Sequence, residues 1–185
     1  MRIIAGALKG RKLTPPVGDT IRPTSDRTRE SIFNLLMHGK FGGDNIIDCH
    51  VVDLCCGTGA LGLEALSRGA KAVTFIDKDK KSIELTRANV LHCGMAQQSF
   101  YVQSDATRLP PAREVASLVL MDAPYATPLL QPAYISLRAQ GWIAAGSLIV
   151  SEEPSGAAIP ELNDAELLDS RHYGKKTVLY IWRIL

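Results

Sequence analysis

Short apolar runs recur along most of the chain, and stretches with helical periodicity separate them. The runs predict strands at Cys49–Leu54, Ala72–Ile76, Phe100–Val102, Ser117–Met121 and Ser147–Val150. The stretches between them predict helices at Ala60–Ser67, about Lys80–Leu91 and about Pro128–Ala139. Strands that alternate with helices are typical of a parallel sheet covered on both faces, so the sequence predicts an α/β fold.

Both ends of the chain depart from this alternation. Leu167–Tyr173 and Thr177–Trp182 flank a tight turn, so the last strand is predicted to be antiparallel. At the other end, Arg2–Ala5 and Arg11–Thr14 predict a small hairpin, and a helix of about Ser25–His38 follows it. A length of 185 residues fits one domain. We divide it into a basic N-terminal arm (1–20), a helical segment that starts with Arg-Pro-Thr (21–40) and a catalytic core (45–185).

The net charge of +2 conceals an asymmetry along the chain. Residues 1–40 hold eight Lys or Arg against three Asp or Glu, a net charge of +5, and the remaining residues have a net charge of −3. A basic N-terminal section on a mildly acidic body indicates that a polyanion would be met by the N-terminus. The alternative is a solvated, flexible arm.

Other features of the composition exclude several classes of protein. No run of eighteen apolar residues exists, and the N-terminus lacks the apolar core of a signal peptide, so we expect a cytoplasmic protein with no membrane association. The four cysteines show no paired C-x-x-C spacing, which favours reduced thiols and neither a disulfide framework nor a metal site. Nothing in the sequence requires more than a monomer.

The segment Val51–Gly62 predicts a buried strand that runs into a glycine turn and opens a helix. Its pattern Gly57-x-Gly59-x-x-Gly62, with Asp77 twenty residues beyond the first glycine, also satisfies a dinucleotide fingerprint. Asp53 decides between a dinucleotide and S-adenosylmethionine as the ligand of this loop. A carboxylate here opposes the pyrophosphate of a dinucleotide but attracts the ammonium and sulfonium of S-adenosylmethionine. The predicted cofactor is therefore S-adenosylmethionine.

Acids recur at the predicted carboxyl ends of four strands, where ligands bind in such sheets. Each alone could be a helix N-cap, but four in register favour a binding site. Asp77 is placed to accept the ribose hydroxyls, and Asp105 to accept the adenine amino group. From this loop and these strand ends we predict cofactor contacts by Asp53, Cys55, Gly57, Thr58, Gly59, Asp77, Lys78, Asp105 and Ala106.

The tetrapeptide Asp122-Ala123-Pro124-Tyr125 points to methyl transfer onto an exocyclic amine. The lone pair of such an amine is conjugated into the base, so it must be localised to attack. The Asp122 carboxylate and the Ala123 carbonyl can accept its two N–H bonds, which is catalysis by positioning and electrostatic stabilisation. Pro124 stiffens the turn and Tyr125 offers a ring on which the base can stack. A plain strand-to-loop turn is the alternative.

Three blocks of sequence resemble the bacterial family of 16S ribosomal RNA guanine-N2 methyltransferases. They are Arg2–Gly6 with Gly10–Leu13, the Arg-Pro-Thr block from Arg22 to Leu36, and Asp53 to Ala70. The resemblance implies a Rossmann-like, seven-stranded methyltransferase sheet, mostly parallel with an antiparallel last strand. It also implies S-adenosylmethionine as the cofactor and, as the substrate, a guanine of 16S rRNA, presented in a small-subunit particle. This chain departs from the family at Ala123, where the family usually has proline; the backbone carbonyl survives that change.

Basic and polar residues near the N-terminus complete the predicted site. Arg22 and Thr24 are expected to shape the cofactor pocket, while Lys9, Arg11, Lys12, Arg27 and Arg29 are expected to bind RNA. Cys55 and Cys56 lie on the cofactor loop and not beside the tetrapeptide, so we discount a cytosine-C5 mechanism. An adenine-N6 methyltransferase remains an alternative, because the same tetrapeptide chemistry serves any exocyclic amine. A catalytically weak RNA-associated protein that binds S-adenosylmethionine is another.

Overall fold

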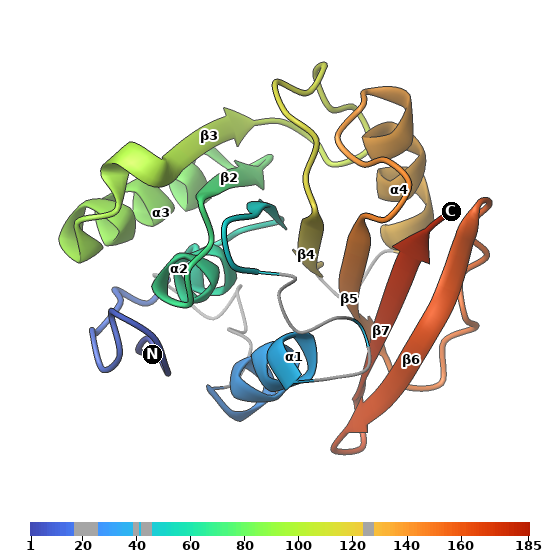
Figure 1. Cartoon of the computed structure of the whole chain (residues 1–185), viewed down its shortest axis with the longest axis horizontal. Helices are drawn as coiled ribbons and strands as arrows, with labels where there is room; N and C mark the ends of the chain where they lie inside the picture. Colours follow the sequence, from blue (N-terminus) through green and yellow to red (C-terminus); the bar gives the residue numbers. More distant parts are fainter. Residues whose placement is uncertain (17–25, 39–40, 42–45, 124–127) are drawn as a thin grey trace.

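The computed structural model describes residues 1–16, 26–38, 41, 46–123 and 128–185 (Figure 1). The helices of these residues are α1 (Asp26–His38), α2 (Ala60–Ser67), α3 (Lys80–Cys93) and α4 (Leu130–Ala139), with a 3₁₀ turn at Ala96–Gln98. The strands are β1 (His50–Leu54), β2 (Ala72–Asp77), β3 (Ser99–Gln103), β4 (Leu118–Asp122), β5 (Leu148–Pro154), β6 (Ala165–Tyr173) and β7 (Thr177–Ile184).

The strands form one seven-stranded sheet in the order β3-β2-β1-β4-β5-β7-β6. β1 to β5 are parallel to one another, and β7 runs antiparallel between β5 and β6. The predicted α/β class and the antiparallel last strand are therefore confirmed. Strand order reverses between β1 and β4, and in sheets of this kind the ligand crevice lies at the carboxyl ends of the strands beside such a switch point.

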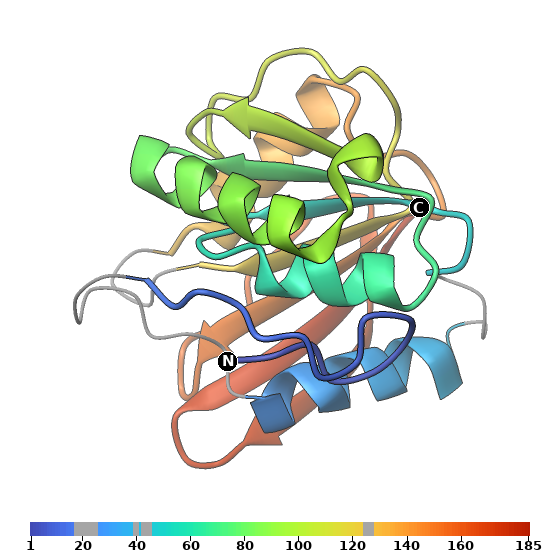
Figure 2. The same cartoon turned by 90° about the vertical axis from the view of Figure 1, so that its left-hand side faces the viewer.

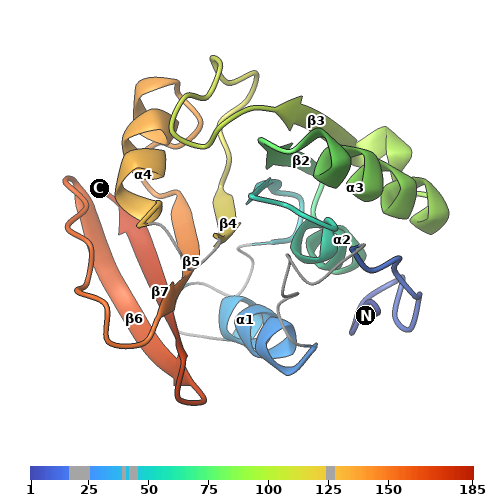
Figure 3. The same cartoon turned by 180° about the vertical axis from the view of Figure 1, so that it is seen from behind.

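Helices cover both faces of the sheet (Figures 1 and 3). On one face, α1, α2 and α3 pack on alternate strand residues that include Phe75, Leu120 and Val150. On the other face, α4 packs on the residues between them, such as Ile76, Val119 and Met121. Because successive side chains of a strand point to opposite faces, each strand residue can be assigned to one layer. We call the first layer the α1–α3 face.

The N-terminal arm packs against this layer (Figure 2). The predicted hairpin consists of one isolated antiparallel bridge between Arg2 and Lys12, supported by backbone bonds such as Ile3 N–H to the Arg11 carbonyl at 2.9 Å. Ile3, Leu8 and Leu13 of the arm are buried. None of the helices in the described ranges is both long and apolar enough to span a membrane.

Candidate active site

Asp53 lies beneath the glycine loop at the start of α2. Its Oδ2 accepts the Gly62 N–H at 2.8 Å, so the carboxylate satisfies one of the unpaired N–H groups of the helix's first turn. The side chain is buried, and desolvation, with smaller contributions from the charges of Asp122 and Asp77, raises its pKa to about 8, although the Gly62 N–H opposes the shift. A cation bound beside Asp53 would favour the carboxylate form.

The glycine loop itself has a left-handed backbone. Gly57 and Gly59 have φ values of 53° and 75°, and Cys55 has a φ of 63°. Residues other than glycine seldom adopt this backbone conformation. A Cβ on Gly62 would lie 2.4 Å from the Phe75 ring, so α2 packs on β2 too closely for any other residue there. The left-handed residues form the tight turn between β1 and α2 that the sequence pattern predicts.

Asp77, the last residue of β2, holds the loop from the other side. Its Oδ2 accepts the Gly57 N–H and its Oδ1 accepts the Asp79 N–H, both at 2.9 Å. From α3, the Thr86 hydroxyl donates to the Gly57 carbonyl at 2.9 Å, and the Asn89 amide donates to the Thr58 carbonyl at 3.0 Å. The loop is therefore shaped by side chains that surround it before any ligand binds.

The remaining predicted cofactor residues differ in exposure. Asp105 is exposed and lies two residues beyond β3; its Oδ1 accepts both the N–H and the hydroxyl of Thr107 at 2.8 Å, which lowers its pKa. Ala106 is buried and Lys78 is exposed. The Thr58 hydroxyl is buried and donates to the Met1 sulfur at 3.7 Å, so the arm covers this part of the loop.

Asp53, Asp77 and Asp122 all belong to the α1–α3 face. Asp53 is in register with Phe75 and Leu120, and Asp77 and Asp122 follow those two residues by two positions. The three acids therefore lie on the same face at the carboxyl ends of β2, β1 and β4, around the switch point. This brings together the cofactor acids and the predicted catalytic acid.

A small pocket opens beside Asp122, between the sheet and the helices α1 and α2. It is lined by Ile32, Leu61, Leu120, Met121, Asp122, Val150, Glu152 and Leu179. Ala123, which follows Asp122, is buried. Most of the lining by described residues is apolar, and the charged residues among them are Asp122 and Glu152.

The cysteines of the loop are poor nucleophiles. Burial, with the charges of nearby carboxylates including Asp77 and Asp53, raises the pKa of Cys55 to about 12, and burial raises that of Cys56 further. Both thiols therefore stay protonated near neutral pH, which agrees with the exclusion of a thiolate mechanism. No group of three His, Cys, Asp or Glu residues suited to a metal ion occurs in the described part of the chain.

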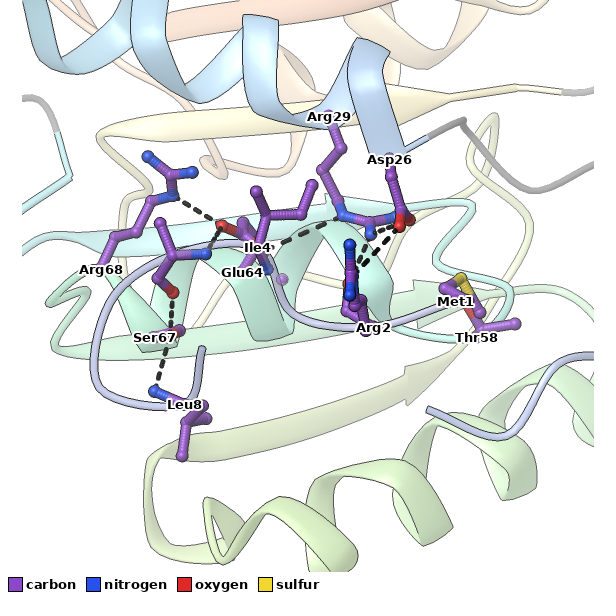
Figure 4. Close-up of polar contacts among 12 residues, drawn as sticks. Met1, Arg2, Ile4, Leu8, Asp26, Arg29, Thr58, Glu64, Ser67 and Arg68 are labelled. Atoms are coloured by element: carbon purple, nitrogen blue, oxygen red, sulfur yellow. Dashed lines mark hydrogen bonds and ion pairs between the residues drawn. The ribbon is translucent and has the colours of Figure 1, made fainter. Parts of the chain in front are cut away.

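A buried charge network joins the arm, α1 and α2 (Figure 4). Glu64, fully buried in α2, accepts the N–H groups of Ile4 and Ala5 and the Arg68 guanidinium, at 2.8–3.0 Å. Arg29 of α1 lies 3.9 Å from Glu64 and donates to the Arg2 carbonyl at 2.6 Å and to Asp26 at 2.7 Å. Residues 1–16 of the arm are thus held by buried polar contacts, and the flexible-arm alternative does not describe the backbone of these residues.

This network changes the interpretation of the basic residues. Arg29 has 0% of its surface exposed, so it cannot touch a phosphate in this structure, and its predicted role in RNA binding is corrected to a structural one. Lys9, Arg11, Lys12 and Arg27 are exposed, although the Arg11 guanidinium also donates to the His92 carbonyl at 2.9 Å. Four predicted site residues lie outside the described residues: Arg22, Thr24, Pro124 and Tyr125.

Sequence reasoning missed two acids of this region, Glu64 and Glu152. A signal existed for Glu64, since it is the one charged residue of the otherwise apolar helix Ala60–Ser67. For Glu152 the signal was a pair of acids, Glu152 and Glu153, at the end of a buried strand. Only the register with Asp122 shows that Glu152 is the acid on the same face as Asp122.

The residues around the glycine loop fit S-adenosylmethionine. The buried carboxylate of Asp53 suits a cationic ligand, and Asp77 offers acceptors at the end of β2 where hydroxyls of a ribose would lie. A pyrophosphate would instead oppose the carboxylate form of Asp53 and meet the second acid, Asp77.

Comparisons with known proteins agree with this geometry. The family model described as "Conserved hypothetical protein 95" matches residues 1–182. The ribosomal RNA small subunit methyltransferase D of Escherichia coli strain K12 is 35% identical over 163 residues, covering 86% of this chain and 78% of the relative. Its counterpart of the same name from Haemophilus influenzae is 35% identical over 156 residues, covering 82% and 78%.

A solved structure supports the same assignment. The Escherichia coli protein yhhF, described as a candidate methyltransferase, superposes with a TM-score of 0.83 at 31% identity and covers 100% of this chain and 97% of its own. The resemblance inferred from the sequence is confirmed, and the chain belongs to the Conserved hypothetical protein 95 family, together with the ribosomal RNA small subunit methyltransferases D to which it is similar.

Proposed function

We propose that this protein transfers a methyl group from S-adenosylmethionine to the N2 amine of a guanine in 16S ribosomal RNA. The observation that carries the proposal is the placement of Asp53, Asp77 and Asp122 on one face of the sheet at the switch point. Membership of the family adds the class of substrate, since named relatives are ribosomal RNA small subunit methyltransferases. We further propose that it acts as a cytoplasmic monomer on a small-subunit particle.

The residues divide the work between binding and positioning. Asp53, Asp77 and the glycine loop, with Arg22 and Thr24, would hold the cofactor, which when bound supplies an electrophilic methyl group. Asp122 would accept one N–H of the target amine and the Ala123 carbonyl the other, which localises the lone pair for attack. Pro124 and Tyr125 keep the roles predicted for them, stiffening the turn and stacking on the base.

RNA would be met by the N-terminal arm, where Lys9, Arg11 and Lys12 are exposed on a backbone that is itself docked on α2 and α3. Phosphate contacts of this kind position RNA without reading its sequence. Arg27 at the start of α1 is exposed and would add a further contact.

Radiolabelled methyl transfer tests the proposal directly. Small-subunit particles and naked 16S rRNA that lack the modification would be incubated with the protein and labelled S-adenosylmethionine, and the RNA digested for nucleoside analysis. We expect label in N2-methylguanosine. Label in N6-methyladenosine would support the adenine alternative, and cofactor binding without transfer to either substrate would support the non-catalytic one.

A further inference from the structure

One buried asparagine joins the N-terminal arm to the glycine loop. Asn89 of α3 is only 1% exposed and forms hydrogen bonds in two directions. Towards the arm, its Oδ1 accepts the Thr14 N–H at 2.8 Å and its Nδ2 donates to the Thr14 carbonyl at 3.2 Å. Towards the loop, the same Nδ2 donates to the Thr58 carbonyl at 3.0 Å. A single side-chain amide therefore contacts both segments.

This set of bonds explains why the position holds asparagine. The Thr14 N–H needs an acceptor, which fixes the orientation of the amide, and the two carbonyls then meet the donors of its NH₂ group. Asparagine is the one side chain of its length that offers an acceptor and two donors. Because a buried amide is costly unless it is hydrogen-bonded, the favoured arrangement is the one in which arm and loop both bond to Asn89.

A second residue of α3 supports the same loop. Thr86 lies one turn before Asn89, and its hydroxyl donates to the Gly57 carbonyl at 2.9 Å. A Cβ on Gly59 would lie 2.7 Å from the Thr86 side chain, so α3 packs closely on the loop. Thr86 and Asn89 therefore bond to the carbonyls of two successive loop residues, Gly57 and Thr58.

The arm has anchors at both ends of α2. At the loop end, the Met1 sulfur accepts the Thr58 hydroxyl at 3.7 Å (Figure 4), and Thr14 is bonded to Asn89. At the other end, the hydroxyl of Ser67, the last residue of α2, accepts the Leu8 N–H at 2.9 Å. The anchor at Asn89 and the anchor at Ser67 can therefore be removed separately.

We propose that Asn89 is a positioning residue for S-adenosylmethionine, which holds the Thr58 carbonyl and with it the glycine loop in the shape that binds the cofactor. Because Asn89 is buried, it acts through the backbone of Thr58, and its bonds to Thr14 make the arm part of the same support. This inference rests on the proposed function and extends it, because it links the segment proposed to meet RNA with the loop proposed to bind the cofactor.

Three single variants separate these anchors. Asn89→Ala removes bonds to both the arm and the loop, Thr86→Val removes a bond to the loop, and Ser67→Ala removes bonds to the arm. Calorimetry should show S-adenosylmethionine binding weakened about tenfold in Asn89→Ala and in Thr86→Val, the scale of one buried hydrogen bond. Affinity in Ser67→Ala should stay within about twofold of the wild type. The methyl-transfer rate of Asn89→Ala at saturating cofactor should also change little.

Hydrogen exchange in the wild-type protein gives a second measurement, which does not depend on the folding of a variant. The Thr14 N–H, the Asn89 amide and the Thr58 carbonyl are bonded in series, so cofactor bound at the loop should slow exchange of the Thr14 N–H. The Leu8 N–H, bonded to Ser67, is the reference, because stabilisation of the whole protein would slow both N–H groups equally. We expect exchange to slow at least about threefold more at Thr14 than at Leu8.

The outcomes separate this inference from the proposed function. Unchanged cofactor affinity in Asn89→Ala, an equal loss in Ser67→Ala, or equal slowing of exchange at Thr14 and Leu8 would overturn the role of Asn89 and leave the proposed function intact. Failure of the wild-type protein to bind S-adenosylmethionine would overturn the proposed function, and this inference with it.

Discussion

The site has two halves that are built differently. The cofactor half consists of Asp53, Asp77 and the loop of residues 55–62, and its two acids are bonded to backbone N–H groups of that loop and of α2. The half proposed to hold the base consists of Asp122 and the pocket beside it, where the ends of β4 and β5 place Asp122 and Glu152 next to apolar side chains. The proposed cofactor half is therefore organised by bonds within the fold itself, whereas the half proposed to hold the base places its acids at the ends of two neighbouring strands. Substitutions in the first should change binding of the cofactor, and those in the second should change the reaction.

The largest effect is expected from Asp122→Ala. Removing the acceptor that localises the amine should lower the single-turnover rate of methyl transfer by at least about a hundredfold, the scale of one lost transition-state hydrogen bond. Cofactor affinity, measured by calorimetry, should stay nearly the same, because Asp122 belongs to the base half. Near-wild-type chemistry in this variant would contradict the proposed role of Asp122, and a parallel loss of cofactor affinity would break the distinction between the halves.

Asp53→Asn tests the cofactor half. The amide oxygen can still accept the Gly62 N–H, so the variant removes charge while it keeps the cap of α2. Affinity for S-adenosylmethionine should fall by about 1–3 kcal/mol, the scale of a hydrogen bond to a charged group. The matched measurement is the methyl-transfer rate at saturating cofactor, which should change much less. Unchanged calorimetric affinity would refute the assignment of Asp53 to the cofactor.

The raised pKa of Asp53 predicts a pH dependence of the same contact. The folded protein holds this proton up to about pH 8, whereas the unfolded chain releases it near 3.8, so the free energy of unfolding should fall as pH rises between these values. The contribution is at most about 1.4 kcal/mol per pH unit. A cationic cofactor favours the carboxylate, so its binding at about pH 6.5 should release a proton.

Calorimetry in buffers with different ionisation enthalpies measures that proton release. Asp53→Asn is the control, since it has no proton to lose at this position. Equal proton release by the wild type and the variant would show that another group titrates, and a flat stability profile for the wild type between about pH 5 and 8 would contradict the raised pKa.

Most of the fold could be predicted from the sequence because its elements have strong local signals. The apolar runs locate the first five strands and the tight turn locates the last two, each to within a few residues, and Ala60–Ser67 is predicted as it is observed. The recurrence of acids at strand ends located Asp53, Asp77 and Asp122, because parallel strands bring their carboxyl ends to one edge. Pairing between strands that are distant in the sequence was harder to predict. That Glu152 lies beside Asp122 depends on the register of β5 against β4, which no local sequence pattern encodes.

Arg29 and Arg27 illustrate the same limit. Both are arginines in the first turns of α1, and nothing in their local sequence separates a buried partner of Glu64 from an exposed side chain. The difference comes from the arm, which folds back over α2 and supplies the Arg2 carbonyl to Arg29. Charge counts along the chain therefore locate a basic N-terminal section, but they do not show which of its members reach the surface.

The smallest expected effect concerns the arm, which packs on the helices of the cofactor half and yet is proposed to bind RNA. Replacing Lys9, Arg11 and Lys12 by Ala should reduce the salt dependence of RNA binding by roughly two to three phosphate equivalents. Cofactor affinity should not change, since the buried contacts of Glu64 and Ser67 with the arm use its backbone. An identical salt slope in wild type and triple variant would show that these side chains are only solvated, and a loss of cofactor affinity would show that they support the loop instead.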